Sequence, residues 1–251
     1  MEEIIQIKHV GGFKMKDLAL VLYSHSDYSD LWEIAFKKIN QFFKIEKKYI
    51  FINKINNNQI YDFIPIYYND NLNYNKRVAE CLNKINDKYI LFLHEDMILY
   101  NQVDIKNLLE KYKFLCENPK FKYFRLIKSG ITSCIQIHQN IFEISEQDFC
   151  FSITPSIWKK NTLFEICNIL PSMNIWNLEI NGSEYVKQNK IKGFYWFDNE
   201  PKRGQNHFDS NLFPHICSAI FKGKWNMEYK NELNEIFKEF NINPNIRGSI
   251  F

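Results

Sequence analysis

Apolar and polar positions follow each other along the first half of the chain in blocks that predict strands and helices in turn. Apolar runs of strand length occur at 18–23, 48–53, 63–67 and 89–93. Apolar residues at helical spacing occur between and after them, at about 31–42, 73–86 and 104–117. Because Pro65 cannot donate a hydrogen bond, we expect the third run at a sheet edge. This order favours an α/β fold with a mostly parallel sheet flanked by helices.

The pattern changes near residue 120, where the apolar runs become shorter. Strands are predicted at 121–127, 134–137, 149–153, 191–197 and 216–221. Helices are predicted at 156–168 and 175–187, and an amphipathic terminal helix at about 229–240. The sequence has no internal repeat or low-complexity linker, so we expect one domain over residues 1–251 with a smaller mixed half over about 121–251.

Composition and charge narrow the class of protein. The chain has 251 residues, of which 45% are hydrophobic and 16% aromatic, enough for a sizeable core. Its formal net charge of +3 is spread along the chain, which argues against a nucleic-acid-binding face. No run approaches the roughly 18 apolar residues of a membrane span, and the acidic start does not resemble a signal peptide. Its widely spaced cysteines, without a C-x-x-C pair, indicate free, mostly buried thiols in the cytoplasm.

The most informative stretch is the predicted strand at 89–93 and the polar residues after it, His94, Glu95 and Asp96. In open α/β sheets, ligands bind beyond the carboxyl ends of the strands. Adjacent acids there repel each other unless a cation or strong hydrogen-bond donors offset their charge. Such a cluster suits Mg²⁺ or Mn²⁺ bridging to a substrate phosphate. The alternative is a strand that ends in solvated charges.

A second polar segment, from Ser24 to Tyr28, directly follows the first predicted strand. Asp27 could accept a hydrogen bond from a ribose or a base, and Tyr28 could stack on the base. The alternative is that Ser26 or Asp27 caps the following helix. The segment has no glycine, and neither a dinucleotide fingerprint nor a Walker loop occurs anywhere in the chain.

Aromatic and polar residues of the second half suggest an acceptor site. Trp158 and Trp176 offer flat apolar surfaces suited to sugar rings. Glu179 follows Trp176 closely in sequence and could serve as a general base for an acceptor hydroxyl. The alternative places both tryptophans in the core and Glu179 in solvent. Further along, His215 could complete a metal site and the lysines at 222 and 224 could meet a diphosphate, unless they are structural or solvated residues.

Together these segments, over about residues 18–225, resemble a glycosyltransferase of the GT-A fold. The order matches as well as the residue types. Arg77 lies in a helix between the two polar segments, and the strand ending in His94-Glu95-Asp96 stands where the family has its Asp-x-Asp motif. The resemblance is strongest to bacterial and viral GT-A-like proteins with Glu-Asp-Met or Glu-Asp-Tyr at this strand end. His94 departs from the family pattern, because an aspartate is expected at its position.

The resemblance implies a hexosyltransferase-like enzyme of polysaccharide biosynthesis, which moves a sugar from UDP or another nucleotide to a hydroxyl of a glycan, a lipid-linked saccharide or another acceptor. Residues 1–120 would bind the nucleotide and 121–251 the acceptor. Asp96, with His215, would hold Mn²⁺ or Mg²⁺, and Glu179 would be the base. Trp158 and Trp176 would flank the acceptor. The donor would be bound by Ser24, Asp27, Tyr28, Arg77, His94 and Glu95.

Other functions fit the same pattern. A nucleotidylyltransferase uses a similar sheet, although its glycine-rich, basic phosphate loop is missing after the first strand. A non-catalytic nucleotide-sugar or carbohydrate-binding protein would keep the fold and lose the metal site. The expected partners are a nucleotide-sugar and a glycan acceptor, without nucleic acid, at a cytoplasmic location where peripheral membrane contact is left open. The sugar, the acceptor, the stereochemical outcome and the oligomeric state also stay open.

Overall fold

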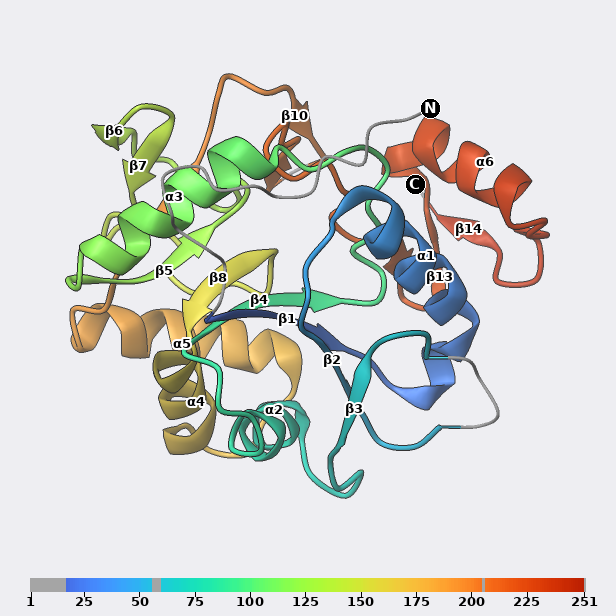
Figure 1. The fold of residues 1–251 in the computed structure, drawn as a ribbon, viewed down its shortest axis with the longest axis horizontal. Helices are drawn as coiled ribbons and strands as arrows, with labels where there is room; N and C mark the ends of the chain where they lie inside the picture. The colour runs from blue at the N-terminus through green and yellow to red at the C-terminus, as the bar shows by residue number, and fades with distance from the viewer. Residues whose placement is uncertain (1–16, 56–59, 205, 251) are drawn as a thin grey trace.

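A mixed β-sheet forms the centre of the molecule (Figure 1). The computed structural model describes residues 17–55, 60–204 and 206–250. Within them, nine strands pair in the order β3-β2-β1-β4-β8-β5-β9-β7-β6. Their bounds are β1 Leu18–Tyr23, β2 Lys48–Ile52, β3 Ile64–Tyr67, β4 Tyr89–His94, β5 Phe121–Arg125, β6 Ile135–His138, β7 Ile141–Glu143, β8 Ser156–Lys159 and β9 Lys192–Trp196.

The half of the sheet that precedes residue 120 is parallel. β3, β2, β1 and β4 run in the same direction, and Tyr23 at the end of β1 is in register with His94 at the end of β4. β8 is antiparallel to both β4 and β5, so the carboxyl ends of β4 and β5 point the same way. The polar residues that follow β1 and β4 therefore meet at one edge, and β3, which contains Pro65, is the edge strand as predicted.

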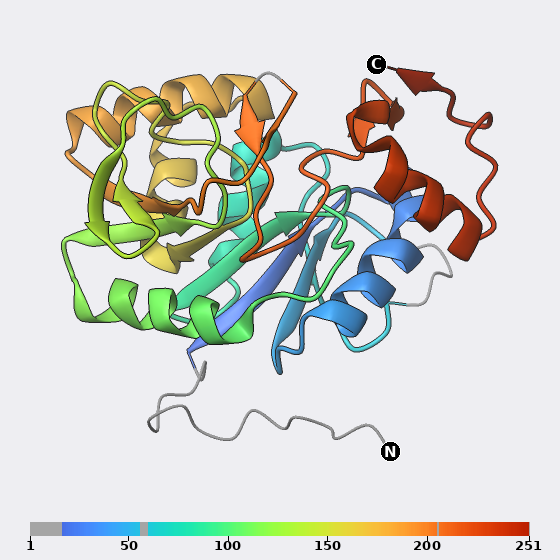
Figure 2. The ribbon, with the colours of Figure 1, turned by 90° about the horizontal axis from the view of Figure 1, so that it is seen from above.

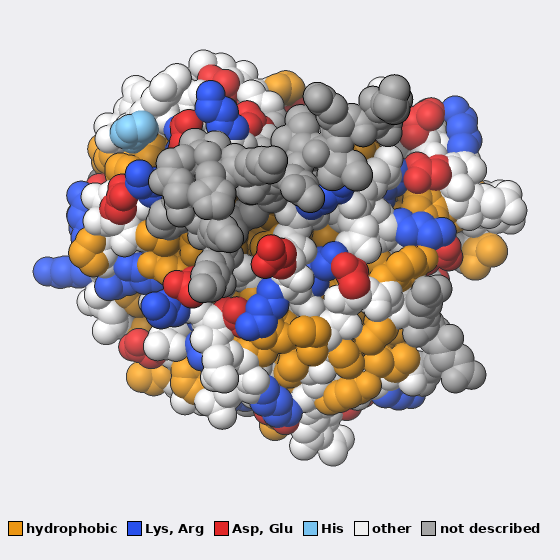
Figure 3. Space-filling model, viewed as in Figure 1, with side chains coloured by type: hydrophobic (Ala, Val, Ile, Leu, Met, Phe, Trp, Pro, Cys, Tyr) orange, Lys and Arg blue, Asp and Glu red, His pale blue; other side chains and the backbone are white. Residues whose placement is uncertain are grey.

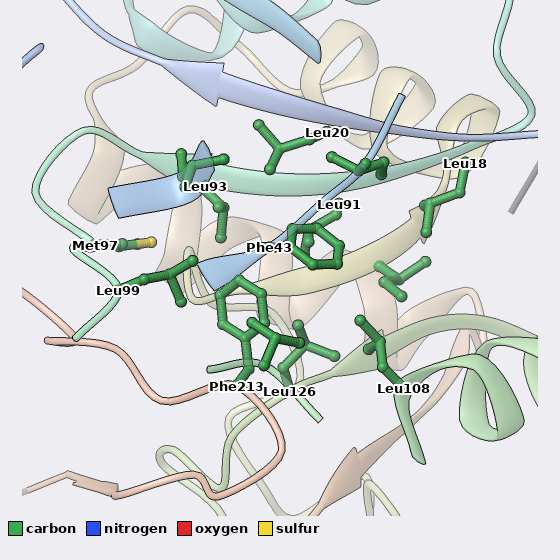
Figure 4. Close-up of a cluster of buried hydrophobic side chains, with 14 of the residues drawn as sticks. Leu18, Leu20, Phe43, Leu91, Leu93, Met97, Leu99, Leu108, Leu126 and Phe213 are labelled. Atoms are coloured by element: carbon green, nitrogen blue, oxygen red, sulfur yellow. The ribbon is translucent and has the colours of Figure 1, made fainter. Parts of the chain in front are cut away.

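Helices cover both faces of the sheet. Successive residues of β1 point to opposite faces, and all of them are buried, so both faces pack against other elements. Leu18, Leu20 and Leu22 pack in one core cluster with α1 and α3 (Figure 4), whereas Ala19 and Val21 pack in a second cluster with α2, α4 and α5. The helices are η1 Ser26–Leu31, α1 Trp32–Phe42, α2 Tyr74–Leu82, α3 Ile105–Glu117, α4 Lys160–Ile169, α5 Ile175–Gln188, η2 Met227–Tyr229 and α6 Lys230–Glu239.

The carboxyl-terminal segment forms a third cluster beside α1, at one end of the molecule (Figure 2). Here α6 packs on a small sheet of β12 Ile220–Phe221, β13 Lys224–Asn226 and β14 Ser249–Ile250. Another pair, β10 Lys202–Arg203 and β11 His207–Phe208, contacts this cluster through an ion pair between Arg203 and Glu232 of α6. Acidic and basic side chains are interspersed on the face shown in Figure 3, as they are along the sequence.

The structure confirms the α/β class with a mostly parallel sheet and corrects several predicted elements of the second half. The predicted helix at 156–168 begins only at Lys160, because residues 156–159 pair as β8 between two strands that are distant in sequence. The predicted strand at 149–153 is irregular, and only Ile220–Phe221 of the predicted strand at 216–221 is extended in a sheet.

The described part of the chain contains no candidate membrane span, and its cysteines form no disulfide. No helix in the described part of the chain is long and apolar enough to cross a membrane. The residues used to argue against a signal peptide lie outside the described ranges. The cysteines are free thiols, of which Cys81, Cys150 and Cys167 are buried while Cys134 is exposed.

Candidate active site

A cavity of about 620 Å³ opens at the carboxyl ends of β1 and β4. This is the place where a parallel α/β sheet binds its ligands. The cavity brings together segments that are far apart in sequence: the ends of β1 and β4, η1, the amino-terminal turns of α2 and α5, and residues 217–223. Its lining includes Tyr23, His25, Tyr28, Tyr74, Arg77, His94, Glu95, Asp96, Trp176, Glu179, Ser218 and Lys222.

Glu95 and Asp96 form an acidic pair in this cavity. Glu95 is buried, and Asp96 is half-buried with its Oδ2 accepting a hydrogen bond from the Ser218 hydroxyl at 3.0 Å. Burial raises the pKa of Asp96 to about 6. Burial and the charge of Asp96 together raise the pKa of Glu95 well above its ordinary value. The pair is therefore short of positive charge, which is the condition that favours a bound cation.

His94, the last residue of β4, directly precedes the acidic pair and carries no charge of its own at neutral pH. Its Nε2 lies 2.7 Å from the Tyr74 hydroxyl, and its ring packs beside Tyr23. Burial lowers the pKa of His94 to about 3, so the imidazole is neutral at pH 7. His94 therefore contributes a neutral, hydrogen-bonded wall to the cavity.

The residues after β1 are arranged differently from the prediction. His25 is the N-cap of η1, because the backbone N–H of Asp27 donates to its Nδ1 at 3.1 Å, and neither Ser26 nor Asp27 is the cap. The side chain of Asp27 is 79% exposed and does not line the cavity, since the first turn of η1 directs it outward. Ser24 is buried and accepts a hydrogen bond from the Trp32 indole at 2.7 Å. Tyr28 and Arg77 do line the cavity.

The structure adds a polar network that was not predicted from the sequence. Asp70 lies 3.1 Å from His25 Nε2 and 2.9 Å from Arg77 Nη2, and it accepts a hydrogen bond from Asn53 at 3.1 Å. Burial opposes ionisation of Asp70, but hydrogen bonds from Asn53 and His25 and the charge of Arg77 lower its pKa overall. Asn53 directly follows β2 and Asp70 comes shortly after β3, so the strand-end rule applied to β1 and β4 could have found both.

Trp176 and Glu179, one helical turn apart on α5, line the same cavity as the acidic pair. Trp176 is 67% exposed, whereas Glu179 is largely buried and its Oε1 accepts a hydrogen bond from the Ile153 N–H at 2.6 Å. Burial raises the pKa of Glu179, although this hydrogen bond and the charge of Arg125 act in the opposite direction. The cavity thus offers a carboxylate and an open aromatic surface on the α5 side.

Trp158 and His215 lie elsewhere. Trp158 is in the central strand β8, only 2% exposed, and stacks on Tyr123 with ring centroids 4.3 Å apart, so it is a core residue in this structure. His215 is buried with its Nδ1 2.6 Å from the Phe213 carbonyl oxygen, and it does not line the cavity. Its position therefore gives no support to joint metal binding with Asp96.

The donor set suits a metal ion only in part. Among the described residues, no group of three His, Cys, Asp or Glu side chains is placed to hold a metal. Asp96 and Glu95 are the hard oxygen ligands that Mg²⁺ or Mn²⁺ prefers, and such ions commonly take their remaining ligands from water and substrate phosphates. The residues therefore fit a metal bound together with a diphosphate.

The raised pKa of Asp96 implies that the stability of the protein depends on pH. The folded protein binds this proton more tightly than the unfolded chain, so ionised Asp96 costs stability above pH 6, and the cost disappears towards the ordinary pKa of 3.8. Asp96→Asn should therefore melt at a higher temperature than the wild type at about pH 8. The difference in melting temperature should shrink as the pH falls through 6. The substitution also removes the charge of Asp96 that raises the pKa of Glu95, which further stabilises the variant at high pH. Thermal melts across this range check the prediction, and a pH-independent difference would contradict it.

Comparison with known proteins identifies structures with a similar fold but no family of related sequences. No protein-family model matches the chain, and no curated protein sequence matches it. A structure of CMP:2-keto-3-deoxy-manno-octonic acid synthetase complexed with CTP is similar, with a TM-score of 0.53 and 7% identity over 90% of this chain and 99% of that one. This likeness confirms the α/β fold with a mostly parallel sheet, which the chain shares with that synthetase.

Weaker similarities extend to two further solved structures. The bifunctional IspDF from Campylobacter jejuni has a TM-score of 0.41 and 14% identity over 80% of this chain and 52% of that one. S. aureus TarS, solved with UDP-GlcNAc, has a TM-score of 0.45 and 12% identity over 74% and 59%. At such TM-scores these two similarities carry no argument about the function of this chain.

Proposed function

We propose that this protein transfers a sugar from a nucleotide-sugar donor to a hydroxyl group of an acceptor. One observation carries the proposal: a single cavity contains the acidic pair at the end of β4 together with Glu179 and the exposed Trp176 of α5. Group transfer needs a donor site and an acceptor site that share one reaction space. The acidic pair and the α5 residues supply the two sides.

On the donor side, the nucleotide lies over the end of β1 and the diphosphate faces Glu95 and Asp96. Tyr28 stacks on the base, and Arg77, fixed by Asp70 and by the Leu72 carbonyl oxygen at 2.6 Å, contributes positive charge. Asp96 and Glu95 would hold Mg²⁺ or Mn²⁺, which neutralises the charge that develops on a departing diphosphate.

On the acceptor side, the Trp176 ring packs against an acceptor sugar and orients its hydroxyl towards Glu179. The hydrogen bond from the Ile153 N–H holds one oxygen of Glu179, which leaves the other available to accept the hydroxyl proton. A raised pKa brings a carboxylate closer to the pKa that suits a general base near neutral pH. Such a base is required when the reaction inverts the anomeric centre.

The test is donor turnover by the purified full chain. UDP-, GDP- and CMP-sugars are supplied with and without Mn²⁺, binding is followed by calorimetry, and release of the nucleotide is followed by chromatography. The proposal expects one nucleotide class to bind and to be turned over slowly by hydrolysis and faster with an acceptor. Binding without turnover under every condition would instead indicate a non-catalytic nucleotide-sugar-binding protein.

Nucleotidylyl transfer is the second candidate, because the similar CTP-bound synthetase shares the fold over 90% of this chain. Against it, residues 24–27 after β1 contain no glycine, lysine or arginine with which to hold a triphosphate. The same preparation is incubated with CTP or UTP and sugars or sugar phosphates. Pyrophosphate release would favour this candidate over sugar transfer.

Tyr28 and Asp27 are neighbours in sequence for which the proposal expects different effects on nucleotide binding. Tyr28→Ala should weaken nucleotide binding roughly 5- to 150-fold, because stacking on a base is worth about 1–3 kcal/mol. Asp27→Ala should leave the affinity near that of the wild type, because its side chain is 79% exposed and outside the cavity. Calorimetric titration of both variants checks this, and equal losses in the two would contradict the placement of the base.

A further inference from the structure

Arg125, the last residue of β5, is a buried charge that the proposed mechanism does not yet use. The residue is 0% exposed, and no ion pair of the described residues involves it. Its guanidinium donates to the backbone carbonyl oxygens of Ser129 at 3.1 Å and Phe149 at 2.7 Å, while Nε has no hydrogen-bond partner among the described residues. Burying a charge without a direct counter-ion is costly, so its position calls for an explanation.

Residues 149–153, here called the support segment, connect Arg125 to Glu179. The segment is irregular, and side chains from neighbouring elements hold its backbone in place of a strand partner. These contacts are Arg125 to the Phe149 carbonyl oxygen at 2.7 Å, Tyr123 to the Cys150 carbonyl oxygen at 2.5 Å, and the Cys150 N–H to Ser183 Oγ at 2.7 Å. At its far end the Ile153 N–H donates to Glu179 Oε1 at 2.6 Å. Arg125 thus fixes the beginning of the segment whose end orients the carboxylate.

Electrostatics provide a second connection. The charge of Arg125 from β5 lowers the pKa of Glu179, and Glu179 in turn raises the pKa of Tyr74 from α2 and of Cys217 from the 217–223 segment. Burial raises the pKa of Tyr74 well above its ordinary value and that of Cys217 to about 12, so both are neutral at pH 7. Across the cavity, Glu95 and Asp96 are the other acids. The positive charge of Arg125 therefore opposes the effect of burial on Glu179.

We propose that Arg125 is a positioning residue for Glu179: its guanidinium fixes the beginning of the support segment, and the Ile153 N–H at the other end of that segment holds the carboxylate. The use of Glu179 as a base rests on the proposed function. The coupling between Arg125 and Glu179 does not, so it can be measured without any substrate.

The experiment follows the carboxyl carbon of Glu179 by NMR in the full chain labelled with ¹³C-glutamate. The signal is assigned by its loss in Glu179→Gln. In Arg125→Gln, which keeps amide donors and removes the charge, the titration should move to higher pH. In Arg125→Lys, which keeps the charge, it should stay close to the wild type. Lys187→Met is the matched control, because it removes a charge from the same helix at a residue paired with Glu184, and it should not move the titration.

An Arg125→Gln titration that matches the wild type would overturn the inference, and so would one that Lys187→Met reproduces. If Arg125→Gln does not fold, the comparison of Arg125→Lys with the wild type decides, and a Glu179 titration at clearly higher pH in the Lys variant would overturn the role of the charge. When turnover is measured, the acidic limb of kcat/KM should move with the titration. Absence of turnover in the wild type would count against the proposed function alone.

Discussion

Alanine in place of Asp96 should abolish sugar transfer and metal-assisted nucleotide binding while leaving the protein folded. Asp96 lies at the end of a buried strand, its carboxylate faces the cavity, and its hydrogen bonds are a 3.0 Å contact from Ser218 and a longer one from the Ile220 N–H. Because its ionised form costs stability, truncation should not unfold the chain. Lewis-acid assistance is worth several kcal/mol, so we expect a rate loss of roughly 10³-fold or more.

Three measurements separate the outcomes for this variant. A thermal melt establishes folding, turnover establishes catalysis, and nucleotide titration with and without Mn²⁺ establishes the metal-dependent part of binding. The exposed Asp27→Ala variant is the matched control for loss of a carboxylate. Wild-type turnover by Asp96→Ala would refute the assignment. Full activity of the native protein in excess EDTA would refute metal dependence and leave the fold and the cavity as described.

Glu179→Gln should lower kcat by roughly 10²–10⁴-fold, the usual range for loss of a general base, while donor binding stays near that of the wild type. Glutamine has nearly the same size, and its carbonyl oxygen can still accept the Ile153 N–H that bonds Glu179 at 2.6 Å. It cannot take up a proton from the acceptor hydroxyl. Donor binding is expected to persist because Glu179 lies on α5, whereas the acidic pair follows β4.

Glu184 provides the matched control on the same helix. Its side chain is 60% exposed, is paired with Lys187, and does not line the cavity, so Glu184→Gln should transfer sugar at the native rate. Product stereochemistry is determined by NMR in parallel, because a retaining enzyme would not need this base. If the enzyme inverts and Glu179→Gln transfers sugar at the native rate, Glu179 is not the base.

Local sequence patterns were sufficient to predict the parallel half of the sheet and the edge at which the polar residues lie. β1, β2 and β4 and helices α1, α2 and α3 are set by local apolar patterns, and the structure reproduces them with small shifts at their ends. Since parallel strands end at a common edge, it followed that His94, Glu95 and Asp96 lie beside the residues after β1. The proximity of Glu179 to Trp176 also followed, because residues one helical turn apart share a face.

Other features depend on contacts between distant segments and cannot be predicted from local sequence patterns. Residues 156–159 read as part of a helix, yet β4 and β5 supply hydrogen bonds on both sides and make them a strand. Trp158 and Trp176 are the same type of residue, but Trp158 is buried in the central strand β8 whereas Trp176 is exposed on α5. The contacts of Asp70 with His25 and Asn53, and of Arg125 with the support segment, join residues distant in sequence. Which polar groups meet in such cases depends on chain packing, because burial and long-range hydrogen bonding arise only once the elements are assembled.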